Sequence, residues 1–396
     1  MRLVFLMPIG IERPSGRRYF NIARELVRRG HQVRLLALHP DLASAPWRRL
    51  VCEGVEVWYV GQMHVRKAGS RVERFGPLAL LRVLIAAVLG FVWGVLRSPA
   101  DIYHLGKPQP LNGLAALIAV VGLRRRPLYL DCDDDEVYSN RFTAPWQAAL
   151  FGFWQWLLPR LARGVTANTR YLADRLQAGG ARRVVHVPNG VDLARLANPD
   201  PALLDGLRAA LRLEGRQVIA YVGALALHNH PVDLLLHAFT EVAAACPRAV
   251  LLLVGGGEDL PALRRWSEAH GLAGRVLFTG QVEHPLAVHL LALAQVSVDP
   301  VRDDPVARAR SPLKLLESLA LGAPVVTGDV GDRRLLLDGG RAGLLVEPGS
   351  APALAAAIRR LLDDPAERAR LAAQARRHVQ AYDWARLAAR WETVYW

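Results

Sequence analysis

The hydrophobic positions of the first half of the chain form short apolar runs, and amphipathic stretches of helical period separate these runs. The runs are LVFLMP (3–8), QVRLLAL (32–38), VEVWYV (55–60), DIYHL (101–105), PLYLDC (127–132), GVTAN (164–168) and RVVHVP (183–188). Strands that alternate with helices in this way build a sheet with helices on its faces. The first half therefore predicts an α/β domain with a doubly wound sheet.

The same alternation begins again after a Pro-, Asp- and Leu-rich stretch at residues 189–215. The second set of runs is QVIAYVG (217–223), AVLLLVGGG (249–257), RVLFTG (275–280), VSVDP (296–300), PVVTGD (324–329) and GLLVEP (343–348). We predict two Rossmann-like domains, residues 1–195 and 196–380, that face one another across a cleft. Residues 381–396 form an amphipathic helix that either crosses back to the N-terminal domain or caps the second one.

Composition agrees with a large globular protein. The chain has 396 residues, of which 52% are hydrophobic. Cys52, Cys132 and Cys246 lie far apart, so neither a disulfide framework nor a zinc site is indicated. The N-terminal sequence lacks the charged lead and cleavage site of a signal peptide, which favours the cytoplasm.

Charge is distributed unevenly. Residues 1–200 hold 28 Lys and Arg against 15 Asp and Glu, whereas residues 201–396 hold 22 against 21. The basic half is expected to bind an anionic partner, such as lipid headgroups or a phosphorylated substrate. No nucleic-acid-binding module is recognised, and the Gly-x-Gly-x-x-Gly pattern of an NAD-dependent dehydrogenase is absent from the segment after the first strand.

Two apolar segments favour a membrane surface as that partner. Residues 83–96 carry no charge, and residues 144–164 concentrate three tryptophans and two phenylalanines. The first segment is shorter than the roughly 20 residues that span a bilayer, although residues 75–97 contain only Arg82 as an internal charge. Interfacial binding is therefore favoured over spanning, and burial against the sheet is the alternative for both segments.

The segment SPLKLLESLALGAP (311–324) predicts a helix with chemistry at its start. Ser311 is a suitable N-cap, and Gly322 is a suitable stop. Free N–H groups at a helix start attract phosphate, and Lys314 and Glu317 lie on one face of the helix. The alternative is a salt bridge between these two side chains.

The order of these motifs resembles the family-4 type glycosyltransferases of the GT-B fold over nearly the whole chain. The resemblance rests on NIARELVRRGHQV (21–33), DIYHLGKPQP (101–110), VVHVPNGVDLARL (184–196), LLLVGGGEDLPALRR (251–265) and the SPLKLLE helix. It implies a retaining hexosyltransferase that moves a sugar from a nucleotide diphosphate donor to an acceptor hydroxyl, without a metal or other cofactor. A lipid-linked or cell-envelope glycan is the expected acceptor, and the inner face of the cell membrane the expected location.

The resemblance also implies the residues that bind the donor. Glu317 is expected to hold the ribose hydroxyls, and the diphosphate is expected to meet backbone N–H groups and cations. The candidate donor-binding residues are Gly16, Arg17, Gly223, His228, His230, Gly255, Gly256, Arg308, Arg310, Ser311, Lys314 and Glu317.

Three residues of the first half are catalytic candidates. His104 corresponds to a family histidine that lines the cleft, although a lone histidine at a strand end is often structural. Asp133 and Asp134 belong to DCDDDE (131–136), which we interpret as a loop that orients the acceptor hydroxyl or supplies a base. A hard-cation site and a solvated acidic turn are the alternatives for this loop.

Departures from the family pattern support a second hypothesis. The family commonly has another acid eight positions before the ribose-binding one, where this chain has Ala309. Ala224 stands at a position that is usually arginine, and His228 or His230 stands near the usual lysine. The alternative function is therefore a non-catalytic binding or scaffold protein at the membrane. If the chain is active, Asp303 or Asp304 is the candidate replacement for the missing acid.

Overall fold

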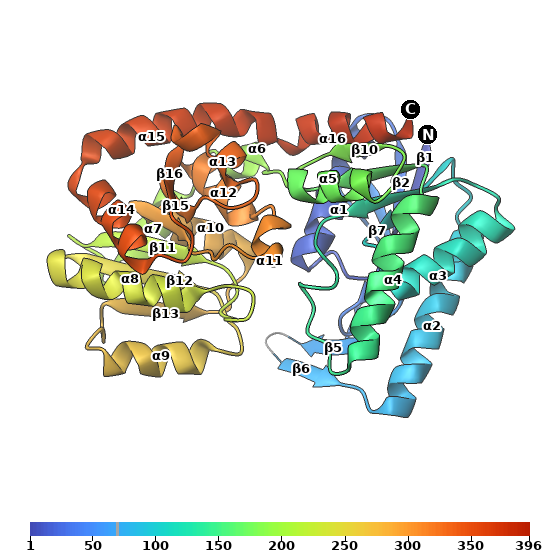
Figure 1. Cartoon of the computed structure of the whole chain (residues 1–396), viewed down its shortest axis with the longest axis horizontal. Coiled ribbons are helices and arrows are strands. Elements are labelled where there is room, and N and C mark those ends of the chain that lie inside the picture. The colour runs from blue at the N-terminus through green and yellow to red at the C-terminus, as the bar shows by residue number, and fades with distance from the viewer. Residues whose placement is uncertain (69–70) are drawn as a thin grey trace. The chain divides into compact units, whose positions relative to one another are not determined.

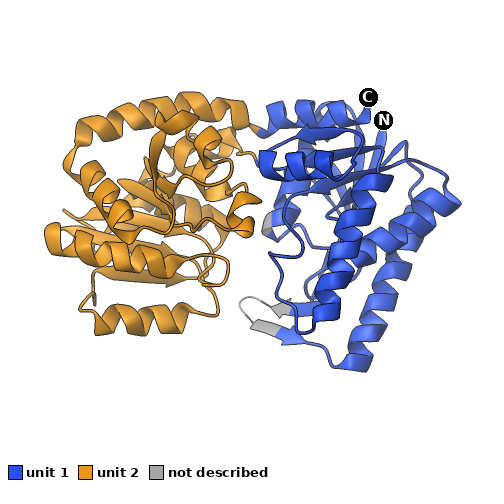
Figure 2. Cartoon of the chain, in the orientation of Figure 1, with its two compact units in different colours: residues 1–189, 384–396 blue, residues 190–383 orange. Residues whose placement is uncertain are grey.

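The computed structural model describes residues 1–68 and 71–396 and divides the chain into two compact units. Unit 1 contains residues 1–189 and 384–396, and unit 2 contains residues 190–383 (Figure 2). The predicted boundaries, at residues 195 and 380, lie within six residues of the observed ones. The C-terminal segment belongs to unit 1.

Unit 1 is an α/β unit (Figure 1). Its strands are β1 (Arg2–Met7), β2 (Gln32–His39), β3 (Arg49–Cys52), β4 (Val55–Gln62), β5 (Val65–Ala68), β6 (Arg71–Arg74), β7 (Ile102–Gly106), β8 (Leu128–Cys132), β9 (Gly164–Ala167) and β10 (Val184–His186). Its helices are α1 (Pro14–Arg28), α2 (Pro77–Leu96), α3 (Pro110–Ala116), the π-helix η1 (Leu117–Leu123), α4 (Pro145–Leu161), α5 (Arg170–Ala178), α16 (Trp384–Glu392) and the short η4 (Thr393–Tyr395).

The main sheet of unit 1 has the order β10-β9-β8-β7-β1-β2-β4-β3. All neighbouring pairs are parallel except β3 and β4, which form an antiparallel edge. The order reverses between β1 and β7, so the carboxyl ends of these two strands form the topological switch point of the sheet. The predicted doubly wound fold is confirmed for this unit.

Alternate residues of each central strand point to opposite faces of the sheet. On one face, Leu6 and Leu36 pack with α2, α3, η1 and α4 in a single core cluster. On the other face, Phe5 packs against Trp391 of α16, and α16 packs along α1. Arg29 and His31 also pair with Glu392 of α16. The last segment of the chain is therefore part of the core of unit 1.

Helix α2 contains the apolar segment of residues 83–96 and packs on β4 through its glycines. A Cβ on Gly90 would lie 2.0 Å from the Val60 carbonyl oxygen, and one on Gly94 would lie 3.0 Å from the Leu36 side chain. The helix has the length and composition of a membrane span, but its buried residues Ala87, Phe91 and Val95 attach it to the sheet.

Unit 2 is also an α/β unit. Its strands are β11 (Gln217–Val222), β12 (Ala249–Val254), β13 (Val276–Gly280), β14 (Val296–Asp299), β15 (Val325–Gly328) and β16 (Gly343–Val346). Its helices are α6 (Leu193–Leu196), α7 (Pro201–Ala210), α8 (Val232–Ala245), α9 (Leu260–Ala269), α10 (His284–Ala292), α11 (Pro305–Arg308), α12 (Leu313–Leu321), α13 (Arg333–Leu336), η2 (Asp338–Gly340), α14 (Ala351–Asp363), α15 (Pro365–His378) and η3 (Val379–Tyr382).

The sheet of unit 2 is entirely parallel, with the order β13-β12-β11-β14-β15-β16. This is the strand order 3-2-1-4-5-6 of a doubly wound nucleotide-binding sheet. Helices α8 and α14 cover one face, and α10 lies on the opposite face with α7. The switch point lies between β11 and β14, so a ligand of this unit is expected beyond the carboxyl ends of these two strands.

Candidate functional site

A largely buried cation, Lys314, lies at the switch point of unit 2. Lys314, from the first turn of α12, places Nζ 3.2 Å from Oδ1 of Asp299, the last residue of β14. The same Nζ lies 4.1 Å from the ring centroid of Tyr221 on β11. Carboxylate and aromatic ring together hold the ammonium group between the ends of the two central strands, where a phosphate of the ligand would need it.

Asp299 organises this end of the sheet, and sequence reasoning did not select it. Its Oδ2 accepts a hydrogen bond from Arg333 Nε at 2.9 Å and one from Thr327 Oγ1 at 3.3 Å. Burial alone would raise the pKa of this carboxyl, but Arg333 and Lys314 hold the pKa well below its usual range. The sequence signal that could have identified Asp299 is its position at the end of the apolar run VSVDP (296–300).

The glycine loop after β12 allows two backbone segments to approach closely. A Cβ on Gly255, whose φ is 142°, would lie 2.0 Å from the Gly223 carbonyl oxygen. We expected Gly255 to donate its N–H to a phosphate, but this N–H donates to the Gly280 carbonyl at 3.1 Å. The N–H of Gly223 likewise donates to Val254, at 2.9 Å. Gly223 and Gly255 therefore allow the two backbone segments to pack closely. The next residue after Gly255, Gly256, lies beside Gln281.

Helix α12 begins one residue later than predicted. Its N-cap residue is Pro312, so Ser311 is buried just before the helix and does not cap it. Gly322, with φ 73°, ends the helix as predicted. The expected alternative, a salt bridge between Lys314 and Glu317, is wrong, because these side chains have different partners.

Glu317 is held by a histidine from a neighbouring helix. Nε2 of His284, the first residue of α10, lies 2.7 Å from Glu317 Oε1, and 15% of the Glu317 side chain is exposed. His284 was not identified from the sequence, because the contact joins residues 33 positions apart.

The other arginines and histidines predicted to bind the donor differ in their partners and in their burial. Arg310 Nη1 donates to the Asn229 carbonyl at 2.8 Å, and Arg308 forms an exposed ion pair with Asp303. His228 lies 3.4 Å from Glu258. Burial, with Lys314 and Arg310 nearby, lowers the pKa of His230 to about 2. The His230 ring is therefore neutral at pH 7, and its predicted contact with the diphosphate stays a prediction.

The position of the missing acid is closed to a ligand. Ala309 is fully buried at the end of α11. Asp304 caps α11 by accepting from the Ala307 N–H at 2.8 Å, and Asp303 holds Arg308 on the exposed surface. Both aspartates proposed as replacements for the missing acid thus have local structural partners, and the structure does not support that proposal.

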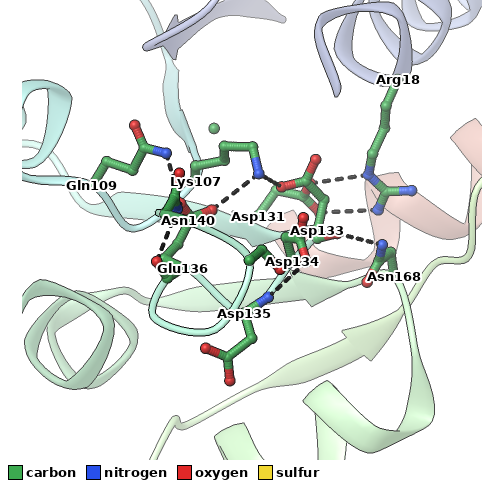
Figure 3. Close-up of polar contacts among 12 residues, drawn as sticks. Arg18, Lys107, Gln109, Asp131, Asp133, Asp134, Asp135, Glu136, Asn140 and Asn168 are labelled. Carbon is green, nitrogen blue, oxygen red and sulfur yellow. Dashed lines mark hydrogen bonds and ion pairs between the residues drawn. The ribbon is translucent and has the colours of Figure 1, made fainter. Parts of the chain in front are cut away.

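A second cluster of charges lies at the carboxyl ends of the strands of unit 1 (Figure 3). Arg18 of α1 is fully buried, and its Nε and Nη2 each lie 3.0 Å from one carboxylate oxygen of Asp131, the residue before Cys132 at the end of β8. Arg18 also donates to the carbonyls of Val187 and Pro188, at 2.7 and 3.0 Å. This bidentate pair joins α1 to β8 and to the residues after β10.

Lys107, directly after β7, is the centre of the other half of this cluster. Its Nζ lies 2.7 Å from Asp133 Oδ1 and 3.0 Å from Glu136 Oε1 (Figure 3). Its backbone has φ 68°, in the left-handed region, and its carbonyl accepts from Asn112. Sequence reasoning missed Lys107, although it is one of three lysines in the chain and follows a buried strand at the switch point.

The two carboxyls bound to Lys107 differ in their pKa. Burial raises the pKa of Asp133, but Lys107 and several hydrogen bonds outweigh this effect and hold it below the usual range. Burial raises the pKa of Glu136, and Lys107 offsets the rise only in part. The lowered pKa favours the carboxylate form of Asp133, which accepts a hydrogen bond more readily than it takes up a proton.

The remaining residues of the acidic loop have separate partners. Asp134 pairs with Ser139, and Asp135 Oδ2 lies 2.6 Å from Arg175 Nη1. Within the described residues, no three His, Cys, Asp or Glu side chains converge in a way that could hold a metal ion.

The two predicted donor-binding residues of unit 1 lie at the start of α1. Gly16 is required by close packing, because a Cβ there would lie 1.9 Å from the Gly10 carbonyl oxygen. Arg17, the next residue, is half-buried.

His104 does not line an accessible surface, which corrects that part of its predicted role. The side chain is fully buried on β7, with Nδ1 3.0 Å from the Tyr395 hydroxyl and its ring 4.8 Å from that of Trp391. Burial and the nearby Arg18 lower its pKa to about 3, so the ring is neutral. The C-terminal aromatic residues cover a position that the sequence pattern left open to solvent.

Two family models match the chain. Residues 15–195 match the model described as Glycosyltransferase Family 4, and residues 216–364 match the model described as Glycosyl transferases group 1. A phosphatidyl-myo-inositol mannosyltransferase of Mycolicibacterium smegmatis is 28% identical over 399 residues, which cover 100% of this chain and 93% of that protein. An alpha-D-kanosaminyltransferase of Streptomyces kanamyceticus is 30% identical over 43% of this chain and 42% of its own length.

Solved structures share the fold over the whole chain. Sucrose-phosphate synthase from Thermosynechococcus elongatus superposes with a TM-score of 0.78 at 20% identity, covering 100% of this chain and 98% of its own. Anabaena HepE in complex with UDP-glucose superposes with a TM-score of 0.72 at 21% identity, covering 100% and 99%. The likeness thus extends over both units.

Proposed function

Because the chain belongs to the family-4 type glycosyltransferases of the GT-B fold, we propose that it moves a hexose from a nucleotide diphosphate donor to a lipid-linked acceptor. The relative of similar length is named for mannosyl transfer to phosphatidyl-myo-inositol, and HepE was solved with UDP-glucose. These names support the reaction class.

The observation that carries the proposal is the placement of Lys314 and Glu317 on one helix at the switch point of unit 2. Lys314, held by Asp299, supplies a positive charge where the diphosphate would leave. Glu317, held by His284, supplies a carboxylate that would accept hydrogen bonds from ribose hydroxyls. One helix thus offers a cation for the diphosphate and, three residues later, a hydrogen-bond acceptor for the ribose of the same nucleotide.

The acceptor side of the proposal uses unit 1. Asp133 is ionised and fixed by Lys107, so it would orient the acceptor hydroxyl through a hydrogen bond. Its low pKa makes it a weak base. In a retaining reaction of this family type, the departing phosphate oxygen would take the hydroxyl proton, so a strong protein base is not required.

Retention of configuration and independence of metal are also part of the proposal. Lys314 provides a cation beside the expected diphosphate, and this supports charge neutralisation without a metal ion. Proton NMR of the newly formed anomeric centre tests retention, and turnover in excess EDTA tests metal independence. An inverted product, or activity that EDTA abolishes and Mg²⁺ or Mn²⁺ restores, would contradict the respective part.

We further propose that the protein works at the inner face of the cell membrane. A lipid-linked acceptor is held in a bilayer, and residues 1–200 carry most of the net positive charge of the chain. Fractionation of cells that produce the protein tests this location. Recovery in the membrane fraction that high salt partly releases is expected, and recovery only in the soluble fraction at low salt would contradict it.

The transfer reaction is tested with the full chain and a panel of nucleotide sugars, including GDP-mannose and UDP-glucose. One donor is expected to raise the melting temperature, and that donor with a lipid extract is expected to release nucleotide. If no donor binds, the proposed function is wrong. If a donor binds without release under any acceptor condition, the non-catalytic hypothesis, which Ala309 and Ala224 originally suggested, replaces it.

A further inference from the structure

The outer side of α2 exposes a continuous apolar stripe. Leu78, Leu81, Ile85 and Leu89 follow one another at intervals of three and four residues, and between 51% and 75% of each side chain is exposed. The opposite side of the helix carries the residues buried on the sheet. An amphipathic helix usually turns polar residues outward, so an apolar outer side needs a partner.

Two other elements on the same side of unit 1 also expose apolar side chains. Helix α2 packs against α3 and η1, and α3 packs against α4, all on one side of unit 1 (Figure 1). η1 exposes Ile118 and Val121, and α4 exposes Trp146, Phe153 and Trp156. We call the outward sides of α2, α3, η1 and α4 the apolar face.

The charged side chains on the helices of the apolar face have a single sign. Arg82 and Arg160 are the only charged residues of its four helices, and the guanidinium of Arg160 lies 4.5 Å from the Trp156 ring centroid. Arg97 ends α2 and Arg124 follows η1, where its side chain donates to the Leu96 carbonyl. Arginine and tryptophan at the edge of an apolar surface match the headgroup region of a bilayer.

We propose that the apolar face lies in the headgroup and acyl boundary of an anionic lipid bilayer. The proposal extends the proposed function, since it assigns the surface through which the enzyme would reach a lipid-linked acceptor. Helix α2 would lie in the plane of the interface, because Gly90 and Gly94 keep it packed on β4 and β2. The arginines at the helix ends would bind lipid phosphates while the leucine and tryptophan side chains enter the acyl region.

A second copy of the chain is a poorer partner for this face. A two-fold dimer opposes the same patch on both subunits, so the arginines of one copy would face those of the other without carboxylates on these helices to pair with them. An anionic bilayer supplies both the apolar layer and the counter-charge.

The test uses the full chain and vesicles of phosphatidylcholine, alone or mixed with phosphatidylglycerol. The wild type is expected to sediment with the mixed vesicles, and less with neutral vesicles or at high salt. The double variant Ile85→Glu, Leu89→Glu and the single variant Ile118→Glu are expected to lower partitioning by about tenfold or more. Leu203→Glu, an exposed apolar position on α7 of unit 2, is the matched control and is expected to change nothing.

Melting temperature and donor-induced thermal shift are measured on each variant. The proposal is supported if the variants of the apolar face lose vesicle binding and keep the donor-induced thermal shift of the wild type. This outcome does not depend on the result of the sugar-transfer assay. Vesicle binding that the face variants leave unchanged would overturn it. It would also be overturned if the wild type forms a dimer that these variants dissociate, because the apolar face would then be a subunit interface.

Discussion

Asp299 shows how one buried residue sets both stability and ligand geometry in unit 2. It is an anion between Lys314 and Arg333, and all three side chains are largely removed from water. Asp299→Asn keeps the shape but leaves two cations without a counter-charge. We expect a loss of about 3–5 kcal/mol in the free energy of unfolding of unit 2, measured by denaturant titration. Asp303→Asn, at an exposed ion pair, is the control and should cost less than about 1 kcal/mol.

The same residue predicts a pH dependence. Its folded-state pKa is depressed, so its contribution is complete above the unfolded pKa of about 3.9 and is lost as the pH falls below that value. The difference in stability between wild type and Asp299→Asn should therefore be constant near pH 7 and shrink as the pH falls below about 4. A difference that grows on acidification would show that another group dominates.

His284 is a positioning residue for Glu317 if the proposed ribose contact is correct. His284→Ala should weaken binding of the active donor by several-fold, and Glu317→Ala by about tenfold or more. Isothermal titration with a 2′,3′-dideoxy analogue of that nucleotide separates this role from a structural one, because wild type and His284→Ala should bind the analogue equally. Equal losses for both ligands would contradict the assignment, and His284→Gln should restore part of the affinity.

The sequence indicated candidate site residues, but it did not indicate the contacts that these residues make. Lys314 and Glu317 were identified because they share a helix face near a glycine loop, and such spacing is local. Asp299, Lys107 and His284 were missed, because their partners come from distant strands and helices. His104 was misplaced for the same reason, since a segment almost 300 residues later covers it.

At the level of elements, two glycines of α2 let the helix approach the sheet of unit 1 closely, alongside the buried Phe91 and Val95. Gly90→Ala would improve helix propensity, yet its Cβ would lie 2.0 Å from the Val60 carbonyl oxygen. We expect a lower melting temperature, because α2 must move away from β4. Gly206→Ala on α7 is the matched control: nothing lies within 4 Å of its Cβ, so it should stabilise unit 2 by up to about 1 kcal/mol. A Gly90→Ala variant as stable as the wild type would show that this packing yields easily.

The sequence predicted the strands and helices with strong periodicity, but it did not predict the short antiparallel strands. The parallel strands follow apolar runs that only a buried sheet explains. The antiparallel edge strand β3 and the hairpin β5–β6 are built from four-residue, Arg-containing segments that show no clear apolar run, and their pairing depends on neighbours. The start of α12 was predicted one residue too early, because Ser311 and Pro312 both resemble helix starts.

At the scale of the whole molecule, unit 1 depends on the last segment of the chain. Trp391 is fully buried against Phe5 and His104, with Arg18 5.2 Å from its ring centroid. Trp391→Ala should destabilise unit 1 by about 3–5 kcal/mol. Hydrogen exchange should then increase in β1 and β7 while the strands of unit 2 keep their protection. Uniform exchange throughout both units would show that the two unfold as one.

Unit 2 is an insertion within unit 1, and its two ends meet where Val191 N–H donates to the Tyr382 carbonyl at 2.9 Å. This connectivity has a consequence for biosynthesis. Domains usually fold as they leave the ribosome, beginning with the N-terminal one. Here the ribosome completes all of unit 2 before it makes α16, so the domain that starts first finishes last. During that interval the apolar surface around Phe5 lacks its cover from Trp391, so we expect chaperones to bind the nascent chain there until residues 384–396 emerge.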